Sequence, residues 1–366
     1  MKQKFLSMLL LSAAITGCTS HDVVDTEYNN QANGIRFSAY NGITRGNPVD
    51  GNGEFMANGS TFGVTAFIST GTGAFMGTTG EGAAIVSNGT TWGYVNAGDM
   101  RYWPTGGQAL DFYAYAPYGH TSITNKSFTK TTGLSFDYTV PTDEAKQVDV
   151  MFASATGQTK AAGTNAVNLS FKHALTQVHF AVATKTSSLK IDIAPNGITI
   201  NNIKSTGTFT LPTAANANGW ELTDDKTSYT VTSDEITGEY KDDETPGYTE
   251  IGSADNALML LPQTFGALSG ENEGASLTIS CKIYQVLSDG TKIYLKGSET
   301  GFASIDVPVS SMGVADGVAT EVWNRGKKVT YRLLIGGGPA TGLEPIEFTT
   351  GVDSWDTADG GVIENQ

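Results

Sequence analysis

Short runs of alternating apolar and polar residues make up most of this chain, separated by Gly, Asn, Asp or Pro. They are rich in Thr, Val, Ile, Tyr and Phe, as in Phe62-Gly-Val-Thr-Ala-Phe67 and Leu134-Ser-Phe-Asp-Tyr-Thr-Val140. A period of two places successive side chains on opposite faces of a strand. No long segment shows the three-to-four spacing of an amphipathic helix. The sequence therefore predicts an all-β fold of antiparallel sandwiches.

The length and one change of pattern predict two domains. With 366 residues the chain has room for two or three domains of ordinary size. The stretch Ser154–Asn165 is small and polar, as in a linker or long loop. After it, the alternating apolar residues that include Phe171 have the opposite parity to those that include Phe180, so the chain must bend between them. We expect an N-terminal β-sandwich over residues 19–165 and a C-terminal one over 166–366.

The first eighteen residues have the features of an export signal. Lys2 and Lys4 precede the apolar run Phe5–Ile15, which is too short to span a bilayer at about 20 residues. The run ends in Ile15-Thr-Gly-Cys18, which resembles a bacterial lipobox. We therefore expect residues 1–18 to be a lipoprotein signal peptide, with Cys18 lipidated as the anchor to the outer membrane. An ordinary signal peptide with an incidental cysteine is the alternative.

Charge and motifs exclude several functions. The 37 acidic and 22 basic residues give a net charge of −15, which disfavours nucleic acid as a partner. The sequence holds no nucleophile elbow, His-Glu-x-x-His pair or Walker loop, so we predict no enzyme, no cofactor and no metal. His173 is expected to be a satisfied structural histidine and not a ligand. Cys281 shares a face with Ile279 and Ile283 and is expected to be a buried thiol.

Two aromatic groups leave two interpretations open. Trp92 lies in Trp92-Gly-Tyr94, and Trp103 lies in Tyr102-Trp-Pro104. Such residues pack in cores and at sandwich edges, or they form a stacking platform for a sugar or another ligand.

Several segments resemble, in order, motifs of one protein family. These segments are Ile35-Arg-Phe37, Ile43-Thr-Arg-Gly46, Phe62–Phe67, Arg101-Tyr-Trp-Pro104, Leu110–Pro117, Asp149-Val-Met-Phe-Ala153, Phe171-Lys-His-Ala-Leu175, Leu258-Met-Leu-Leu-Pro-Gln263, Trp323–Tyr331, Ile346-Glu-Phe348 and Val352-Asp-Ser-Trp355. Each match alone is weak. Their order over almost the whole chain, downstream of a lipobox, makes the sequence similar to the fimbrillin family of Bacteroidetes.

The resemblance implies a fold and a function. The family consists of lipidated precursors of type V pilus subunits, each with two transthyretin-like β-sandwiches in tandem. An arginine-specific protease removes the N-terminal strand, and the C-terminal segment of a neighbouring subunit fills the groove as a donor strand. The resemblance therefore implies a structural pilus subunit with other pilin subunits as partners. It implies an outer-membrane precursor and a final place in the fimbrium at the cell surface.

Two arginines are candidates for the cleavage. Arg45 lies in Asn41-Gly-Ile-Thr-Arg-Gly-Asn-Pro48, whose Gly and Pro residues favour an exposed turn. Arg36 lies inside an alternating run that is expected to be the strand removed. We expect cleavage at Arg45 and place Arg36 second; the alternative is that both are ordinary surface cations.

The C-terminal end leaves its role open. Ile346, Phe348, Val352 and Trp355 supply apolar residues for either a donor strand or a strand that completes the second domain. The tail after Trp355 is acidic and a weak donor strand, which also fits a tip or accessory subunit with an adhesive role. A further alternative is a surface lipoprotein that does not polymerise and binds a glycan, or a host or bacterial surface ligand.

Overall fold

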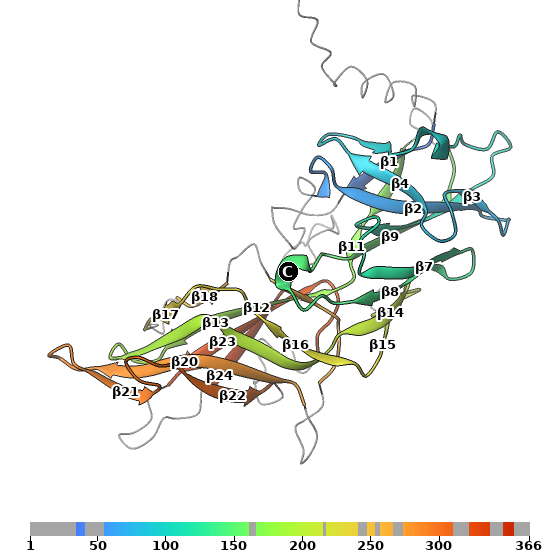
Figure 1. The fold of residues 1–366 in the computed structure, drawn as a ribbon. Coiled ribbons are helices and arrows are strands. Elements are labelled where there is room, and N and C mark those ends of the chain that lie inside the picture. The colour runs from blue at the N-terminus through green and yellow to red at the C-terminus, as the bar shows by residue number, and fades with distance from the viewer. Residues whose placement is uncertain are drawn as a thin grey trace, which may run out of the picture.

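The predicted all-β fold is confirmed. A computed structural model describes residues 34–40, 55–160, 166–214, 217–240, 247–252, 257–265, 274–309, 322–336 and 347–354. These residues form twenty-four strands and two short 3-10 helices, arranged in several sheets. The molecule is elongated, with β1, β2 and β4 at one end and β20 and β21 at the other (Figure 1). In the described part, no helix is long and apolar enough to cross a membrane.

The first half of the chain contributes eleven strands. Their bounds, with those of the 3-10 helices η1 and η2, are β1 Arg36–Tyr40, β2 Thr61–Ile68, β3 Ala74–Met76, β4 Ala83–Ser87, β5 Trp92–Tyr94, η1 Ala97–Asp99, β6 Leu110–Ala116, β7 Ile123–Thr129, β8 Gly133–Thr139, η2 Glu144–Lys146, β9 Met151–Gln158, β10 Ala166–Ser170 and β11 Lys172–His173.

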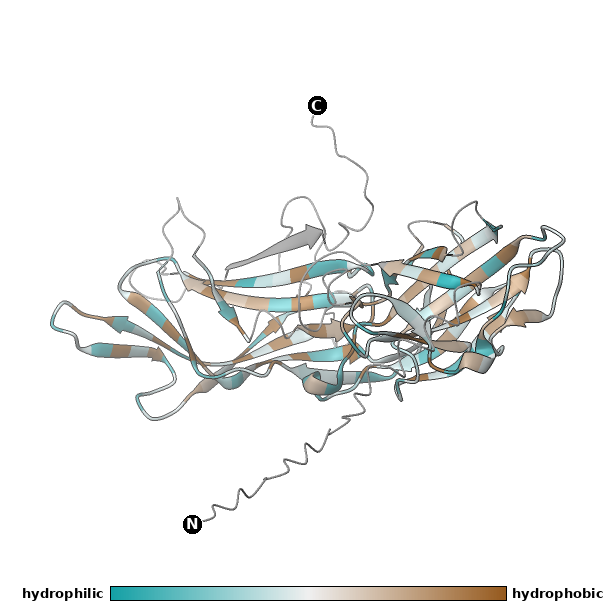
Figure 2. Ribbon diagram, turned by 90° about the horizontal axis from the view of Figure 1, so that it is seen from above, coloured by the Kyte–Doolittle hydropathy of each residue, from teal (hydrophilic) through white to brown (hydrophobic). Residues whose placement is uncertain are grey.

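The second half contributes the other thirteen strands. Their bounds are β12 Thr176–Thr184, β13 Leu189–Lys204, β14 Thr206–Thr210, β15 Trp220–Leu222, β16 Lys226–Thr230, β17 Ile236–Gly238, β18 Thr249–Ile251, β19 Leu258–Leu260, β20 Ser276–Val286, β21 Lys292–Lys296, β22 Ala303–Pro308, β23 Lys327–Ile335 and β24 Glu347–Ser354. Hydrophobic and polar residues alternate along many of them, as Figure 2 shows.

A seven-stranded sheet forms the centre of the N-terminal region. Its order is β11-β9-β6-β2-β4-β5, with β3 paired to β2. The central strand β6 is buried along its whole length because both of its faces are covered. Phe112 faces a core shared with β1 and β10, whereas Tyr115 faces a core shared with the four-stranded sheet β15-β14-β8-β7. The N-terminal region therefore has two cores, one on each face of this sheet.

Strand pairing joins residues on both sides of position 165. β10 and β11 follow residue 165, yet they pair with β1 and β9 of the N-terminal region. The first region's pairing thus continues to His173 and does not end at residue 165. The hairpin β14–β15 also pairs with β8 of the first half. The predicted bend in the chain is present, since Phe171 packs in one core and Phe180 in the other.

The C-terminal sandwich is made of two sheets. One has the order β18-β12-β23-β24, with β19 paired to β12, and the other has the order β16-β13-β20-β21, with β17 and β22 paired to β13 and β20. Most pairs are antiparallel, as predicted, but β12 and β23 run parallel. Phe180 of β12 stacks on Tyr331 of β23 at 5.6 Å between ring centroids. Cys281 is fully buried, as predicted, and burial raises the pKa of its thiol to about 12.

Candidate functional site: the strand β1 and its slot

The strand β1 has one buried face and one exposed face. The side chains of Ile35, Phe37 and Ala39 are buried, whereas Arg36 and Ser38 are exposed. This is the alternation that the sequence predicted for a half-buried strand. β1 pairs with β10 in a parallel ladder, in which Phe37 lies beside Val167 and Ala39 beside Leu169. Among the described strands, these two form a sheet of their own.

Aromatic side chains of the seven-stranded sheet face β1. The ring of Phe37 lies 5.8 Å from that of Phe62 and 6.0 Å from those of Tyr94 and Phe112, measured between centroids. Two of these contacts, those with Phe62 and Phe112, are edge-to-face. Such pairs add a directional term to the burial of apolar area. We call the surface formed by β10, Phe62, Phe112, Trp92 and Tyr94 the β1 slot.

Side chains of β5 bind the backbone of Ile35, just before β1, and of Ala39, near the end of β1. The hydroxyl of Tyr94 donates a hydrogen bond to the carbonyl oxygen of Ile35 at 2.9 Å. The indole Nε1–H of Trp92 donates to the carbonyl oxygen of Ala39 at 3.2 Å. The amide of Ile35 donates to the carbonyl oxygen of Arg101 at 2.8 Å. Outside the ladder with β10, the hydrogen bonds to β1 and Ile35 described here therefore come from two side chains and a loop.

These positions decide between the two interpretations of the aromatic groups. Trp92 is buried, with its ring packed against Phe55 and Phe62. With β1 in place, Trp92 packs in the core and does not present its ring to an external ligand. Trp103 is half-buried and lies edge-to-face against Phe112 at 6.1 Å. Both tryptophans therefore belong to the core beside β1.

The candidate processing residues lie in and after β1. Arg36 is exposed within the strand and lies beside Ala166 in the ladder. Arg45 and the candidate lipidation residue Cys18 lie outside the described residues. The sequence could not show that Trp92 and Tyr94 contact β1; the available signal was that both lie on the same face of one short strand.

The candidate C-terminal residues fall partly in β24. Phe348 lies opposite Leu333 and Val352 opposite Val329 in the antiparallel ladder between β24 and β23. β24 therefore forms an edge of its own five-stranded sheet. Ile346 and Trp355 lie outside the described residues.

His173 has the structural role that the sequence predicted. Its Nδ1 lies 2.8 Å from Oδ2 of Asp149, and both side chains are buried. This pair lies where β11 leaves the seven-stranded sheet and the chain continues into β12.

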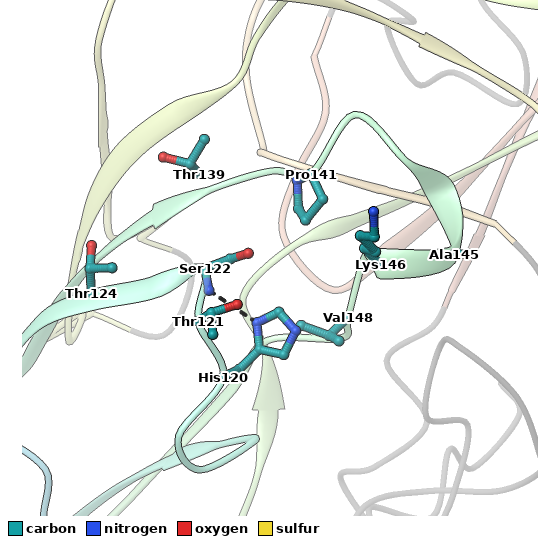
Figure 3. A pocket seen from close by; sticks show the side chains of 9 residues that line it. All are labelled: His120, Thr121, Ser122, Thr124, Thr139, Pro141, Ala145, Lys146 and Val148. Atoms are coloured by element: carbon teal, nitrogen blue, oxygen red, sulfur yellow. Dashed lines mark hydrogen bonds between the residues drawn. The ribbon is translucent and has the colours of Figure 1, made fainter.

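A cavity lies between the ends of β7 and β8 and the helix η2 (Figure 3). Its volume is about 520 Å³, and it is lined by His120, Thr121, Ser122, Thr124, Thr139, Pro141, Ala145, Lys146 and Val148. Nδ1 of His120 accepts a hydrogen bond from the backbone N–H of Ser122 at 3.3 Å. The histidine therefore engages the backbone of Ser122 and not its hydroxyl, so the two do not form a nucleophile–base pair.

This chain is similar to known proteins in sequence and in structure. The sequence profile of the fimbrillin-like family matches residues 44–355. A fimbrial protein from Bacteroides vulgatus superposes with a TM-score of 0.56 at 17% identity, covering 88% of this chain and 99% of that chain. A tip fimbrial protein from Porphyromonas gingivalis gives a TM-score of 0.39 at 13% identity, covering 82% of this chain and 96% of that chain. Curated protein sequences give no match. Because the family profile spans most of its length, this chain belongs to the fimbrillin-like family, whose members are structural fimbrial proteins and not enzymes.

Proposed function

We propose that this protein is a subunit of a surface fimbria, exported as a lipoprotein with its lipid on Cys18 and assembled after β1 is removed. The observation that carries the proposal is the isolated pair of β1 and β10 over an aromatic core. Among the described strands β1 has a single ladder partner, so it can leave without breaking the hydrogen bonds of a larger sheet. Family membership supports a place in the fimbrium at the cell surface, with other pilin subunits as partners.

The bounds of β1 favour Arg45 as the cleavage residue. β1 ends at Tyr40, so a cut after Arg45 detaches the whole strand from the rest of the chain. A cut after Arg36 would leave Phe37 and Ala39 attached and still able to occupy the slot. Hydrolysis at Arg36 also requires a residue held in a ladder to enter a protease. We therefore assign the processing cut to Arg45.

Loss of β1 would create a surface that needs another strand. It would uncover the rings of Phe62, Phe112, Trp92 and Tyr94 and would leave the ladder edge of β10 unpaired. An incoming strand would bury two large side chains in the slot, in the places that Ile35 and Phe37 occupy in the precursor. Their burial contributes about 3–6 kcal/mol to the binding of that strand before ordering costs. An incoming strand also satisfies the edge of β10. Donor-strand exchange between subunits provides both.

The pairing of β24 bears on the origin of the donor. Phe348 and Val352 already lie in a ladder with β23, so we assign them to completing their own sandwich. The strand that fills the slot then comes from another subunit. A tip or accessory position, with an adhesive role, agrees with this assignment.

The test is controlled cleavage of the purified precursor. An arginine-specific protease should release the segment that ends at Arg45, and the trimmed protein should form SDS-resistant multimers alone or with partner subunits. Arg45→Gln should block both steps, whereas Arg36→Gln should leave them intact. Multimers that form equally well from the Arg45→Gln protein would contradict the proposal. They would favour the alternative of a lipoprotein that keeps β1 and binds a glycan or host ligand.

A further inference from the structure

We propose that Tyr94 and Trp92 determine which strand the β1 slot accepts and in which register. In this inference, which rests on the proposed function, the slot selects a strand that runs parallel to β10. Counted from Ile35, the residue just before β1, the pattern has large apolar side chains at the first and third positions and a small one at the fifth. Ile35, Phe37 and Ala39 occupy these positions in the precursor. The partner is therefore a donor segment with this pattern.

The two donors bind carbonyl groups four residues apart. Tyr94 binds the carbonyl of Ile35 and Trp92 that of Ala39, and both side chains come from β5. A shift of one residue would turn both carbonyls and all three apolar side chains to the opposite side of the strand. A shift of two residues would keep the faces but place the wrong side-chain size at each position. The two hydrogen-bond donors, Tyr94 and Trp92, and the side-chain sizes that the slot accepts therefore define one register for the bound strand.

The indole N–H of Trp92 and the hydroxyl of Tyr94 are chemically suited to bind backbone carbonyl groups. The indole Nε1–H is a donor only, so it requires an acceptor such as a carbonyl oxygen. The hydroxyl of Tyr94 lies 2.9 Å from the carbonyl oxygen of Ile35 and 3.4 Å from Sδ of Met76, and the carbonyl is the stronger acceptor. Burial raises the pKa of Tyr94 well above its ordinary value, so the hydroxyl keeps its proton. Neither donor depends on the side chains of the strand that it binds.

The packing around Trp92 and Tyr94 determines which side-chain sizes the slot accepts at each position of the bound strand. The ring of Trp92 is held by Phe55 at 5.1 Å and Phe62 at 4.9 Å between centroids, so it has little freedom to move away from Ala39. Ala39 is buried beside it, and a larger residue there would overpack the core. The third position is different, because Phe37 fits among three aromatic rings.

The first experiment measures how often β1 leaves the slot in the full chain. All variants, and the parent protein with which they are compared, carry Arg45→Gln, so that β1 stays attached to the chain. Arg36 lies inside β1, so cleavage after Arg36 by an arginine-specific protease then reports departure of the strand. Tyr94→Phe leaves the carbonyl of Ile35 without its donor and should raise this cleavage rate roughly tenfold. Trp92→Phe should raise it at least as much. Tyr102→Phe is the control, because Tyr102 is 56% exposed, and should change nothing. Equal rates for Tyr94→Phe and the parent protein would overturn the inference.

The second experiment tests the size rule. Ala39→Leu should speed cleavage after Arg36, whereas Ser38→Leu, at an exposed position of the same strand, should not. Synthetic peptides with the sequence of residues 34–40, carrying either Ala or Leu at position 39, are then added to protein cleaved after Arg45. Mass spectrometry should find the Ala peptide retained and the Leu peptide lost.

The outcomes separate the inference from the proposed function. If the cleaved protein never releases β1 and retains neither peptide, the proposed function fails, while the Tyr94→Phe comparison still tests the role of the donors. If both peptides are retained equally and Tyr94→Phe behaves as the parent protein does, the slot exists but does not select its strand. That result would overturn the inference and leave the proposed function standing.

Discussion

Two parallel strand pairs occur among the described strands, and they differ in how each is built into the fold. β12 pairs with β23 over eight positions inside a five-stranded sheet, and both strands have further ladder partners. β1 pairs with β10 over five positions in a sheet of two strands. Phe180 of β12 and Phe37 of β1 are both buried against aromatic rings. The two strands β12 and β1 thus make similar apolar contacts, but β12 has more backbone ladder partners than β1.

The two pairs show that a strand can bury side chains in a core without being hydrogen-bonded into a large sheet. Removing β12 would break ladders with β18, β19 and β23, so the C-terminal sandwich would not survive. Removing β1 would break one ladder among the described strands, together with a few hydrogen bonds from side chains and a loop. A strand can therefore complete a core and still be exchangeable. The comparison explains why the replaceable element of this fold is expected at β1.

The largest expected effect compares the two phenylalanines. Phe180→Ala should lower the free energy of unfolding by about 3–5 kcal/mol and speed amide exchange throughout the C-terminal sandwich. Phe37→Ala should speed exchange of residues 35–39 and leave the amides of β12 unchanged, because β1 can open alone. Hydrogen exchange with mass spectrometry reads both regions. Equal loss of protection in β12 from both variants would show that β1 is not an independent unit.

A pH effect of intermediate size is expected in the β12·β23 pair. His179 is buried beside Thr330 in this ladder, and its Nε2 has no hydrogen-bond partner. Burial, with a smaller contribution from the positive charge of Lys328, lowers the pKa of His179 to about 3. The unfolded chain, with a histidine pKa near 6.5, binds the proton first as pH falls. Stability should therefore decrease between about pH 6.5 and pH 3.

The size of this effect can be isolated by one variant. From pH 7 to pH 5, His179 should remove about 2 kcal/mol from the free energy of unfolding. His179→Gln should lack this component, so the two urea-unfolding profiles should converge or cross as pH falls. Parallel profiles over this range would contradict the assignment. Protection of β1 should not follow the His179 titration.

The smallest effect is expected at Arg36. Its side chain is exposed, so Arg36→Gln should change the free energy of unfolding by no more than about 0.5 kcal/mol. Thermal melts of wild type and variant should overlay. A substantially lower melting temperature would show that Arg36 stabilises β1, which would weaken the contrast between a replaceable strand and an integrated one.

The sequence predicted which face of a strand is buried better than it predicted which strands pair. The alternation of Ile35, Phe37 and Ala39 predicts a half-buried strand, and the change of parity between Phe171 and Phe180 predicts a bend; both are present. The pairing of β1 with β10 joins segments more than a hundred residues apart. Alternation specifies which side of a strand is buried, but not which distant strand lies beside it.

The same limit explains two features that the sequence could not specify. The stretch after Ser154 has the composition of a linker, but β10 and β11 beyond it return to the first region because Val167 and Leu169 complete the core under β1. Tryptophans occur both in ligand platforms and in cores, and Trp92 is placed in the core by its contacts with Phe55, Phe62 and the backbone of Ala39. Such a contact depends on tertiary structure.

The most direct test of the account is the identity of the first residue of the protein recovered from the cell surface. Mass spectrometry of the N-terminal peptide should find a start at Gly46, which would mean that β1 has been removed and the slot opened. A start at lipidated Cys18, in protein taken from assembled fimbriae, would mean that β1 remains in place and would contradict the account.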